Sequence, residues 1–357
     1  MSEIKGKGRN SNVELLRILM TFGVIVLHYN NHTIGGGFSY AEDDKISLMI
    51  LYFLESLFIC AVDVFVIISG YFLSQTNKRS IGKAMTFIIE VSFFRFCAYC
   101  LRTILSKGGF VLSDIIVNLL PYNWFIICYV ALYLISPLIN KAMNALDMKG
   151  RKHYVILALI VFCGWASFVD IFNELNGIDD YNLSSIGMYG SERGYTIVNF
   201  VVCYILGMAI RWLDLCDLRI RKLHISRKML VLIILSIALV LTVWSYFDQD
   251  TAWEYCNLFV VAEAFCFVLL FLKFDIKENK FINTIAGSAI SVYLLHGYLL
   301  KYIGIDQYAS RGPLILVLHL ILSTAIVFIV CFAIDFVKQL IFGRFLRKLS
   351  ACGIVNY

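Results

Sequence analysis

The stretch V-E-L-L-R-I-L-M-T-F-G-V-I-V-L-H-Y, residues 13–29, decides the fold class of this chain. It is apolar enough to cross a bilayer as a helix, yet it contains Glu14, Arg17 and His28. Arg17 and His28 are eleven residues apart, so on a helix they share one face about 16 Å apart along the axis. Glu14 lies one turn before Arg17 on that face. Because charge at membrane depth is costly and usually functional, we interpret the three residues as one wall of a polar site.

A structural role is the alternative interpretation of the same residues. Arg17 near a membrane boundary would extend its charged end towards the headgroups, with Glu14 as its ion-pair partner. His28 would then be an interfacial histidine at the other end of the segment. This alternative accounts for each residue singly better than it accounts for all three on one face.

The composition is that of an all-α, polytopic membrane protein. Of the 357 residues, 60% are hydrophobic and only 16% are charged, against roughly 25% charged residues in soluble domains. The net charge of +6 is spread over short loops, which argues against nucleic acid as a partner. The 11 cysteines lie mostly inside apolar segments without metal-ligand spacing, so we expect no metal.

The apolar segments predict one transmembrane domain over residues 1–357, with about ten helices and both termini in the cytoplasm. In this arrangement 23 of the 31 Lys and Arg residues fall in cytoplasmic segments and only four in outer segments, as the positive-inside rule requires. We expect a multi-pass protein of the cell (plasma) membrane. The predicted spans are residues 13–29, 46–73, 81–105, 122–139, 154–172, 195–212, 229–247, 253–272, 288–302 and 313–336.

The second predicted span ends in V-D-V-F-V-I-I-S-G-Y-F-L, residues 62–73, and contains two polar candidates. Ser69-Gly70 fits close helix packing better than it fits a reactive site. Asp63 lies deep in the apolar segment, where a carboxylate needs a partner. The candidate partners are Arg17, Arg95 and His296.

Later spans add candidates for which a structural role is as good an explanation. Trp124 opens the fourth span and fits an ordinary interfacial aromatic belt. His296, in S-V-Y-L-L-H-G at 291–297, is either a second wall of the cavity or a hydrogen-bonded packing residue. Arg95 and Arg102 share a helix face, where they either bind an anionic donor or pair with acidic side chains, namely Glu90 and Asp63.

Four motifs in order resemble those of the membrane acyltransferase 3 family. They are E-L-L-R with Arg17-x10-His28, the 62–73 motif, W-F at 124–125 with Y-L-I-S-P at 133–137, and Y-L-L-H at 293–296. The resemblance covers essentially the whole chain. It implies transfer of an acyl group, usually acetyl, from cytoplasmic acyl-CoA to a hydroxyl of a cell-surface or cell-wall polysaccharide or its lipid-linked precursor. It also implies that His28 and Arg17 are needed for activity.

The chain departs from the family pattern in two respects. Many relatives carry Arg-x-x-Arg after the second span, where this sequence has Lys78-Arg79 followed by Lys83. It also lacks the extracytoplasmic hydrolase-like domain of some relatives, so we expect the membrane part to act alone or with a partner. Our candidates for binding the CoA phosphates are Lys78, Arg79, Arg95 and Arg102.

The residue types suit acyl transfer to a hydroxyl. His28 either deprotonates the hydroxyl directly or is transiently acylated and relays the group. Arg17 stabilises either the thioester oxyanion or a CoA phosphate. We expect Asp63 or Glu14 to orient these side chains, and the candidates for substrate binding are Glu14, Ser69, Trp124 and His296.

A membrane transporter or glycan flippase is the rival hypothesis. Transporters often show internal repeats and helices broken by Gly or Pro. We find no repeat, and Pro137 and Pro313 lie at the ends of predicted spans. A non-catalytic scaffold would leave the Arg17–His28 face unexplained. The expected partners are acyl-CoA, the glycan acceptor and membrane lipid, and the sequence leaves room for a homodimer.

Overall fold

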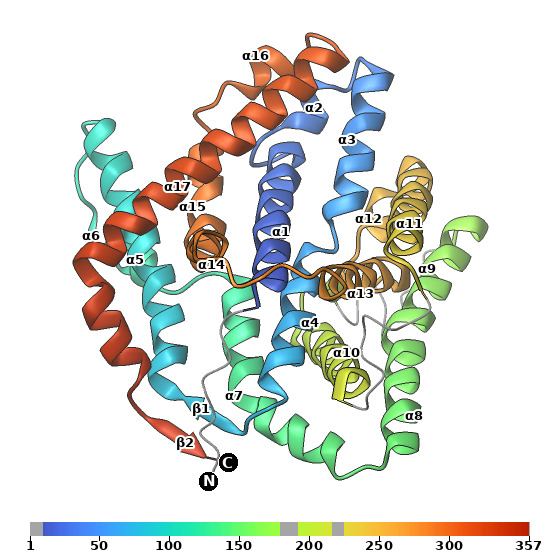
Figure 1. Ribbon diagram of the computed structural model, residues 1–357. Coiled ribbons are helices and arrows are strands. Elements are labelled where there is room, and N and C mark those ends of the chain that lie inside the picture. The colour runs from blue at the N-terminus through green and yellow to red at the C-terminus, as the bar shows by residue number, and fades with distance from the viewer. Residues whose placement is uncertain (1–9, 179–191, 216–224, 357) are drawn as a thin grey trace.

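The computed structural model describes residues 10–178, 192–215 and 225–356, and within them the fold is all-α apart from two three-residue strands. Several basic residues counted for the topology, in 1–9 and 216–224, lie outside the described residues. The first helix, α1 (Ser11–Asn30), runs through the middle of the molecule (Figure 1). It contacts α3 (Lys45–Phe58), α4 (Ala61–Leu73), α13 (Leu258–Leu272), α14 (Lys280–Gly287), α15 (Ala289–Leu300) and α17 (Pro313–Ser350).

The remaining elements surround this centre (Figure 1). They are α2 (Gly37–Tyr40), β1 (Lys78–Ser80), α5 (Ile81–Leu105), α6 (Leu112–Leu119), α7 (Trp124–Asn144), α8 (Met148–Leu159), the π-helical η1 (Ile160–Gly164), α9 (Trp165–Asn176), η2 (Glu192–Gly194), α10 (Ile197–Leu215), α11 (Arg227–Phe247), α12 (Gln249–Ala252), α16 (Ile305–Ala309) and β2 (Ile354–Asn356).

Each of the ten predicted spans corresponds to helix in the structure. In the part of the chain that is described, eight candidate spans are long and apolar enough to cross a membrane. The other two predicted spans, 253–272 and 288–302, correspond to the shorter apolar helices α13 and α15. The chain is therefore a multi-pass membrane protein, with eight candidate spans and two shorter helices in place of ten equal ones.

Three predicted spans differ in shape from the structure. The second span, 46–73, is broken at Ile59–Cys60 between α3 and α4, where the Phe58 ring covers Gly23 of α1 so closely that a Cβ would lie 2.4 Å from it. α17 continues past the predicted end at residue 336 to Ser350. α7 continues to Asn144, so Pro137 lies inside a helix, and its predicted place at a span end is wrong.

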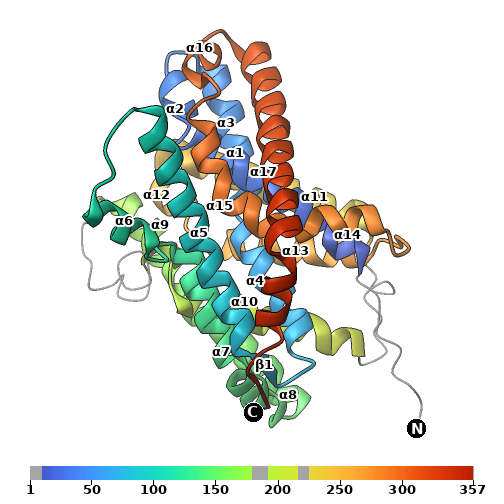
Figure 2. The same ribbon diagram turned by 90° about the vertical axis from the view of Figure 1, so that its left-hand side faces the viewer.

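The described parts of the segments predicted to be cytoplasmic lie on one side of the molecule, along the bottom and right of Figure 2, with β1 at the bottom and α14 at mid-height on the right. β1 pairs antiparallel with β2, which brings the connection after α4 beside the C-terminal segment. Asn140 Nδ2 donates to the Leu73 carbonyl at 3.0 Å, and Asn12 Nδ2 donates to the Phe274 carbonyl at 2.7 Å. These contacts agree with the predicted alternation of loops, while the membrane side that this part of the molecule faces stays a prediction.

α4 and α10 touch through their backbones. A Cβ at Gly70 would lie 2.0 Å from the Tyr204 carbonyl oxygen, and one at Gly207 would lie 2.1 Å from the Ile67 carbonyl oxygen. Small residues at such positions let membrane helices approach closely. The packing interpretation of Gly70 is confirmed, and the contact holds α4 in place beside the candidate site.

Candidate functional site

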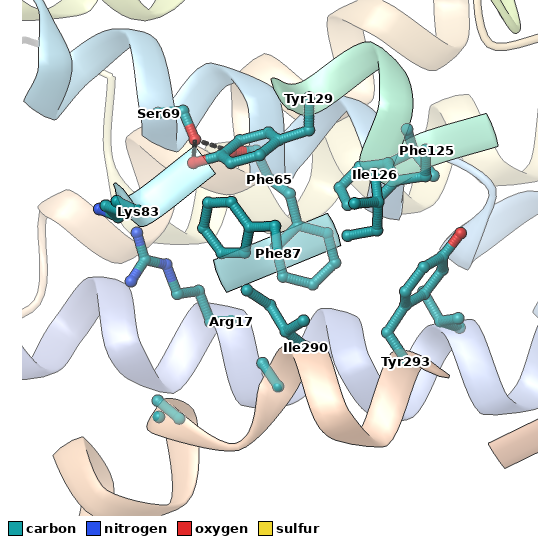
Figure 3. Close-up of a pocket in the computed structure, with 15 residues that line it drawn as sticks. Arg17, Phe65, Ser69, Lys83, Phe87, Phe125, Ile126, Tyr129, Ile290 and Tyr293 are labelled. Atoms are coloured by element: carbon teal, nitrogen blue, oxygen red, sulfur yellow. Dashed lines mark hydrogen bonds between the residues drawn. The ribbon is translucent and has the colours of Figure 1, made fainter. Parts of the chain in front are cut away.

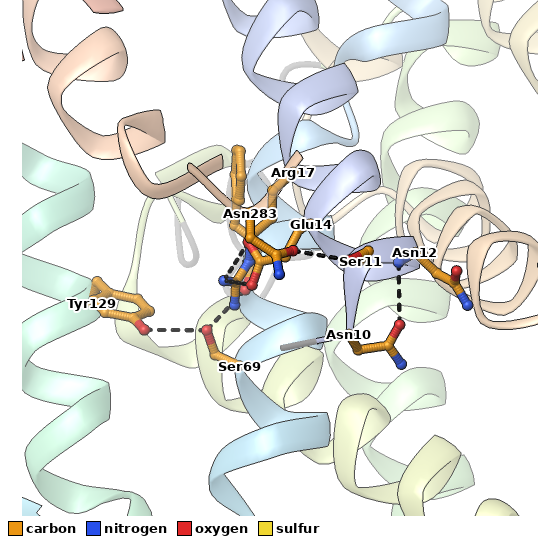
Figure 4. A network of polar contacts seen from close by, with 9 residues as sticks. Asn10, Ser11, Asn12, Glu14, Arg17, Ser69, Tyr129 and Asn283 are labelled. Carbon is orange, nitrogen blue, oxygen red and sulfur yellow. Dashed lines mark hydrogen bonds and ion pairs between the residues drawn. The ribbon is translucent and has the colours of Figure 1, made fainter. Parts of the chain in front are cut away.

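Glu14 and Arg17 form the ion pair that the structural interpretation of these two residues expects. Arg17 Nη1 donates to Glu14 Oε1 at 3.2 Å, and the Glu14 side chain is only 8% exposed (Figure 4). The side chain of Arg17 is 30% exposed. Nearby, the Ser11 hydroxyl donates to Asn283 Oδ1 at 3.0 Å and so joins the start of α1 to α14. The buried carboxylate orients the guanidinium while leaving part of it open to a cavity.

That cavity, the arginine pocket, encloses about 280 Å³ between α1, α4, α5, α7, α14 and α15. Lys83, from the first turn of α5, lies with Arg17 at its charged end (Figure 3). The Ser69 hydroxyl lies 3.2 Å from Tyr129 Oη on the pocket wall. The rest of the wall is mostly apolar and aromatic, with Phe65, Phe87, Phe125, Ile126, Ile290 and Tyr293.

At the other end of α1, two histidines meet. The rings of His28 and His296 are T-shaped, with 4.5 Å between their centroids. In each ring Nδ1 lies against the backbone carbonyl oxygen four residues earlier, at 2.8 Å from Val24 and 3.0 Å from Val292. With Nδ1–H donating to these carbonyls, the Nε2 atom of each ring carries a lone pair and can accept a proton.

The two histidines line a second cavity of about 310 Å³, the histidine pocket. His296 is 4% exposed, and its Nε2 has no hydrogen-bond partner among the described residues. Trp124 also lines the pocket, and its ring stacks on Tyr255 at 5.6 Å. Asn123, Tyr293 and Lys301 complete the polar part of the wall. The structure thus brings His28, His296 and Trp124 together, whereas Arg17, predicted on the same wall as His28, lines the other pocket.

Asp63 lies behind the site and lines neither pocket. It is fully buried at the start of α4, and its Oδ1 accepts a hydrogen bond from Asn199 Nδ2 of α10 at 2.9 Å. The prediction that Arg17, Arg95 or His296 is the partner of Asp63 is wrong, because an uncharged amide takes that place. Asp63 therefore ties α4 to α10.

Arg79 is also placed away from both pockets, although it is the largest fully buried side chain described. Its Nε–H donates to the Tyr133 carbonyl at 3.1 Å and to Ser136 Oγ at 2.8 Å. Pro137 has no N–H to give to that carbonyl, so the guanidinium replaces the missing helical hydrogen bond together with the Ser136 hydroxyl, which donates to the same carbonyl at 2.8 Å. Its other nitrogens donate to carbonyls of the α4–β1 connection, namely those of Leu73, Thr76 and Lys78.

The remaining basic candidates are spread over other places. Lys78 is exposed on β1. Arg95 donates to the Tyr122 carbonyl at 3.3 Å, and Arg102 lies over the Tyr99 ring. The predicted pairing of these arginines with Glu90 is wrong, because Glu90 accepts from Lys338 Nζ at 3.0 Å. Arg102 follows Lys83 by 19 residues on α5, so it lies about 28 Å along the axis from Lys83 at the charged end of the arginine pocket.

Sequence reasoning missed several residues that the structure places in the pockets, among them Lys83, Tyr129 and Tyr293. Lys83 looked like part of a basic turn, and Tyr129 carried no signal of its own. Tyr293 did carry one, because it precedes His296 by three residues and so shares its helix face. Among the described residues, no group of three or more His, Cys, Asp and Glu side chains is arranged to hold a metal ion.

Comparison with known proteins identifies the family of this chain. The model of a family described as an acyltransferase domain, the acyltransferase 3 family, matches residues 10–336. No curated protein and no solved structure gives a significant match. The match covers most of the chain, including every residue named in the two pockets. The chain therefore belongs to the acyltransferase 3 family and is a multi-pass membrane acyltransferase.

Proposed function

We propose that this acyltransferase moves a short acyl group, acetyl in the simplest case, from cytoplasmic acyl-CoA to a hydroxyl of a cell-surface or cell-wall polysaccharide or its lipid-linked precursor. The observation that supports this most is the pair of neighbouring pockets along α1, one containing Arg17 and the other His28, with Tyr293 lining both. One pocket is suited to an anionic, elongated donor and the other to a polar acceptor. We place the enzyme in the plasma membrane.

The arginine pocket suits the donor. Its charged end is formed by Arg17 and Lys83, and cationic side chains are the usual ligands of phosphate groups. It lies near the starts of α1 and α5, on the side of the molecule where the predicted cytoplasmic segments gather. Beyond the charges the wall is aromatic, which suits the uncharged pantetheine arm. Lys83 thus takes the role in phosphate binding that the sequence predicts for Lys78 and Arg79.

The histidine pocket suits the acceptor hydroxyl. The free Nε2 lone pair of His28 can take the hydroxyl proton while the oxygen bonds to the acyl carbon, and the C–S bond breaks to release CoA. An acyl-His28 intermediate, formed first and then attacked by the hydroxyl, uses the same lone pair. Both routes agree with the Nδ1–H bond to Val24, which holds the ring in one orientation.

The distance along α1 separates the roles of its two key residues. Arg17 and His28 lie about 16 Å apart along the axis, so a thioester carbonyl beside His28 is out of reach of Arg17. We therefore assign Arg17 to the CoA phosphates and not to the oxyanion. Glu14 orients Arg17 through their 3.2 Å contact.

Trp124 is our candidate for holding the acceptor. Together with Tyr255 it offers an aromatic surface at the wall of the histidine pocket, and such surfaces with a few polar groups are typical of ligand pockets. Asn123 and Lys301 supply hydrogen-bond partners beside it. The transporter hypothesis is not retained, since the family is one of acyltransferases.

The proposal is tested by supplying the purified protein in nanodiscs with radiolabelled acetyl-CoA and lipid-linked glycans extracted from the source membranes. We expect CoA release together with label on the glycan fraction, and loss of both in His28→Ala. His153→Ala, which changes an exposed histidine of α8, serves as the matched control and keeps its activity. Folded protein that binds no acetyl-CoA and releases no CoA would refute the proposed donor.

A further inference from the structure

Tyr293 is the residue that the two pockets share. Its ring belongs to the wall of the arginine pocket, and it also belongs to the wall of the histidine pocket. In Figure 3 it lies at the end of the arginine pocket opposite Arg17 and Lys83. His28 lines only the histidine pocket. Tyr293 therefore stands between the cavity that suits the donor and the histidine that reacts.

The side chain is held there by contacts from two helices. Its ring packs against Phe125 of α7, with 5.1 Å between centroids, and lies 6.0 Å from the ring of His296. Its hydroxyl donates to Asn123 Oδ1 across 3.4 Å, a long hydrogen bond. The same Oδ1 accepts from the Ile126 backbone N–H at 3.0 Å and caps α7. The phenol is thus positioned by α7 through contacts weak enough to be broken.

Separation of the pockets matters because two nucleophiles compete for a thioester. The acceptor pocket is polar and holds His28, so any water that enters it can be activated as a sugar hydroxyl is. Excluding water from a reactive acyl group is a recognised task of closing side chains. From this position the geometry points to Tyr293 as the partition that keeps the thioester in the arginine pocket apart from water in the histidine pocket until an acceptor is bound.

This inference rests on the proposed function and adds a positioning residue to it. Without the ring of Tyr293, water reaches the thioester in the absence of any acceptor. His28 Nε2 takes one proton of the water, the oxygen bonds to the acyl carbon, and the C–S bond breaks. The products are a free carboxylic acid and CoA, whose thiolate takes up a proton. Tyr293→Phe keeps the ring and therefore keeps the partition.

The test measures CoA release from acetyl-CoA by the full-length protein in nanodiscs with no acceptor present. We expect Tyr293→Ala to raise this rate about tenfold over the wild type, and Tyr293→Phe to stay within about twofold. The double variant His28→Ala/Tyr293→Ala should lose the increase. Tyr302→Ala removes an exposed tyrosine just after α15 and should match the wild type.

Binding of acetyl-CoA to each variant is measured by its effect on thermal unfolding. This measurement distinguishes failure of the partition from failure of the proposed donor. Tyr293→Ala protein that binds acetyl-CoA as the wild type does, yet shows no rise in acceptor-free release, overturns the partition alone. A purely structural role would lower the release and would not raise it. If the wild type itself binds no acetyl-CoA, the proposed donor fails and the partition fails with it.

Discussion

The imidazole of His28 meets that of His296 edge to face, with 4.5 Å between the ring centroids. Each ring has its Nδ1 against a backbone carbonyl, so each presents Nε2 as its basic atom. Two imidazoles this close cannot both hold a proton cheaply, because like charges repel strongly where water is scarce. Protonation of one of the two rings therefore disfavours protonation of the other.

For His296→Ala we expect kcat to fall about tenfold or more, because the neighbour of the proposed base is lost. The KM for acetyl-CoA should change little, since His296 does not line the arginine pocket. Steady-state turnover at several acetyl-CoA concentrations measures both. A raised KM at constant kcat would contradict the assignment of His296 to the acceptor side.

Lys83→Met should raise the KM for acetyl-CoA about tenfold, which corresponds to about 1.4 kcal/mol of lost binding. The reason is that Lys83 lies beside Arg17 at the charged end of the arginine pocket. Lys78→Met is the matched control, because Lys78 is an exposed lysine five residues earlier, on β1, and does not line the pocket. The two variants giving equal KM values would argue against Lys83 as a phosphate ligand.

Arg79→Met should act on stability and not on donor binding. The change removes five hydrogen bonds of the guanidinium, although the Tyr133 carbonyl keeps the Ser136 hydroxyl as a donor and the Leu73 and Thr76 carbonyls keep Asn140 Nδ2. Hydrogen bonds to a charged group contribute about 1.5–3 kcal/mol each, so we expect a loss of at least about 3 kcal/mol. Thermal unfolding in detergent measures it. A variant as stable as the wild type with a raised KM would instead restore Arg79 to the donor site.

Gly70→Ala should disrupt the contact between α4 and α10. The added Cβ would lie 2.0 Å from the Tyr204 carbonyl oxygen, so the helices must separate. Overpacking of this kind costs roughly 1–3 kcal/mol or more. Gly109→Ala, where nothing lies within 4 Å of the new Cβ, provides the comparison. Equal thermal stability of the two variants would show that the close approach is not needed.

Much of the fold could be predicted from the sequence because a bilayer constrains it so strongly. In lipid, a helix makes all of the backbone hydrogen bonds within its own segment. Each long apolar segment of the sequence therefore predicts one helix. The common face of Glu14 and Arg17 followed from helical periodicity alone. The lengths of α13 and α15 could not be predicted from the sequence. Neighbouring helices cover these two helices, and hydropathy does not distinguish burial by other helices from burial in lipid.

The partners of buried polar groups could not be predicted in the same way. Asp63 bonds to Asn199, 136 positions away, and Arg79 supports a carbonyl 54 positions away. Such pairs depend on how helices pack, and a single sequence contains no direct signal for them. A buried arginine near a family motif therefore looked like a ligand for phosphate, although its actual work is to satisfy the backbone around Pro137.

The most direct test of the two-pocket account compares acetyl-CoA binding and acetyl-CoA turnover in two variants of α1. We expect His28→Ala to bind acetyl-CoA with wild-type affinity and to lose at least about a hundredfold in turnover. We expect Arg17→Met to lose about tenfold in affinity, with turnover at saturating acetyl-CoA affected much less. If both variants instead lose binding and turnover together, α1 carries one undivided site, and the separation into donor and acceptor pockets is wrong.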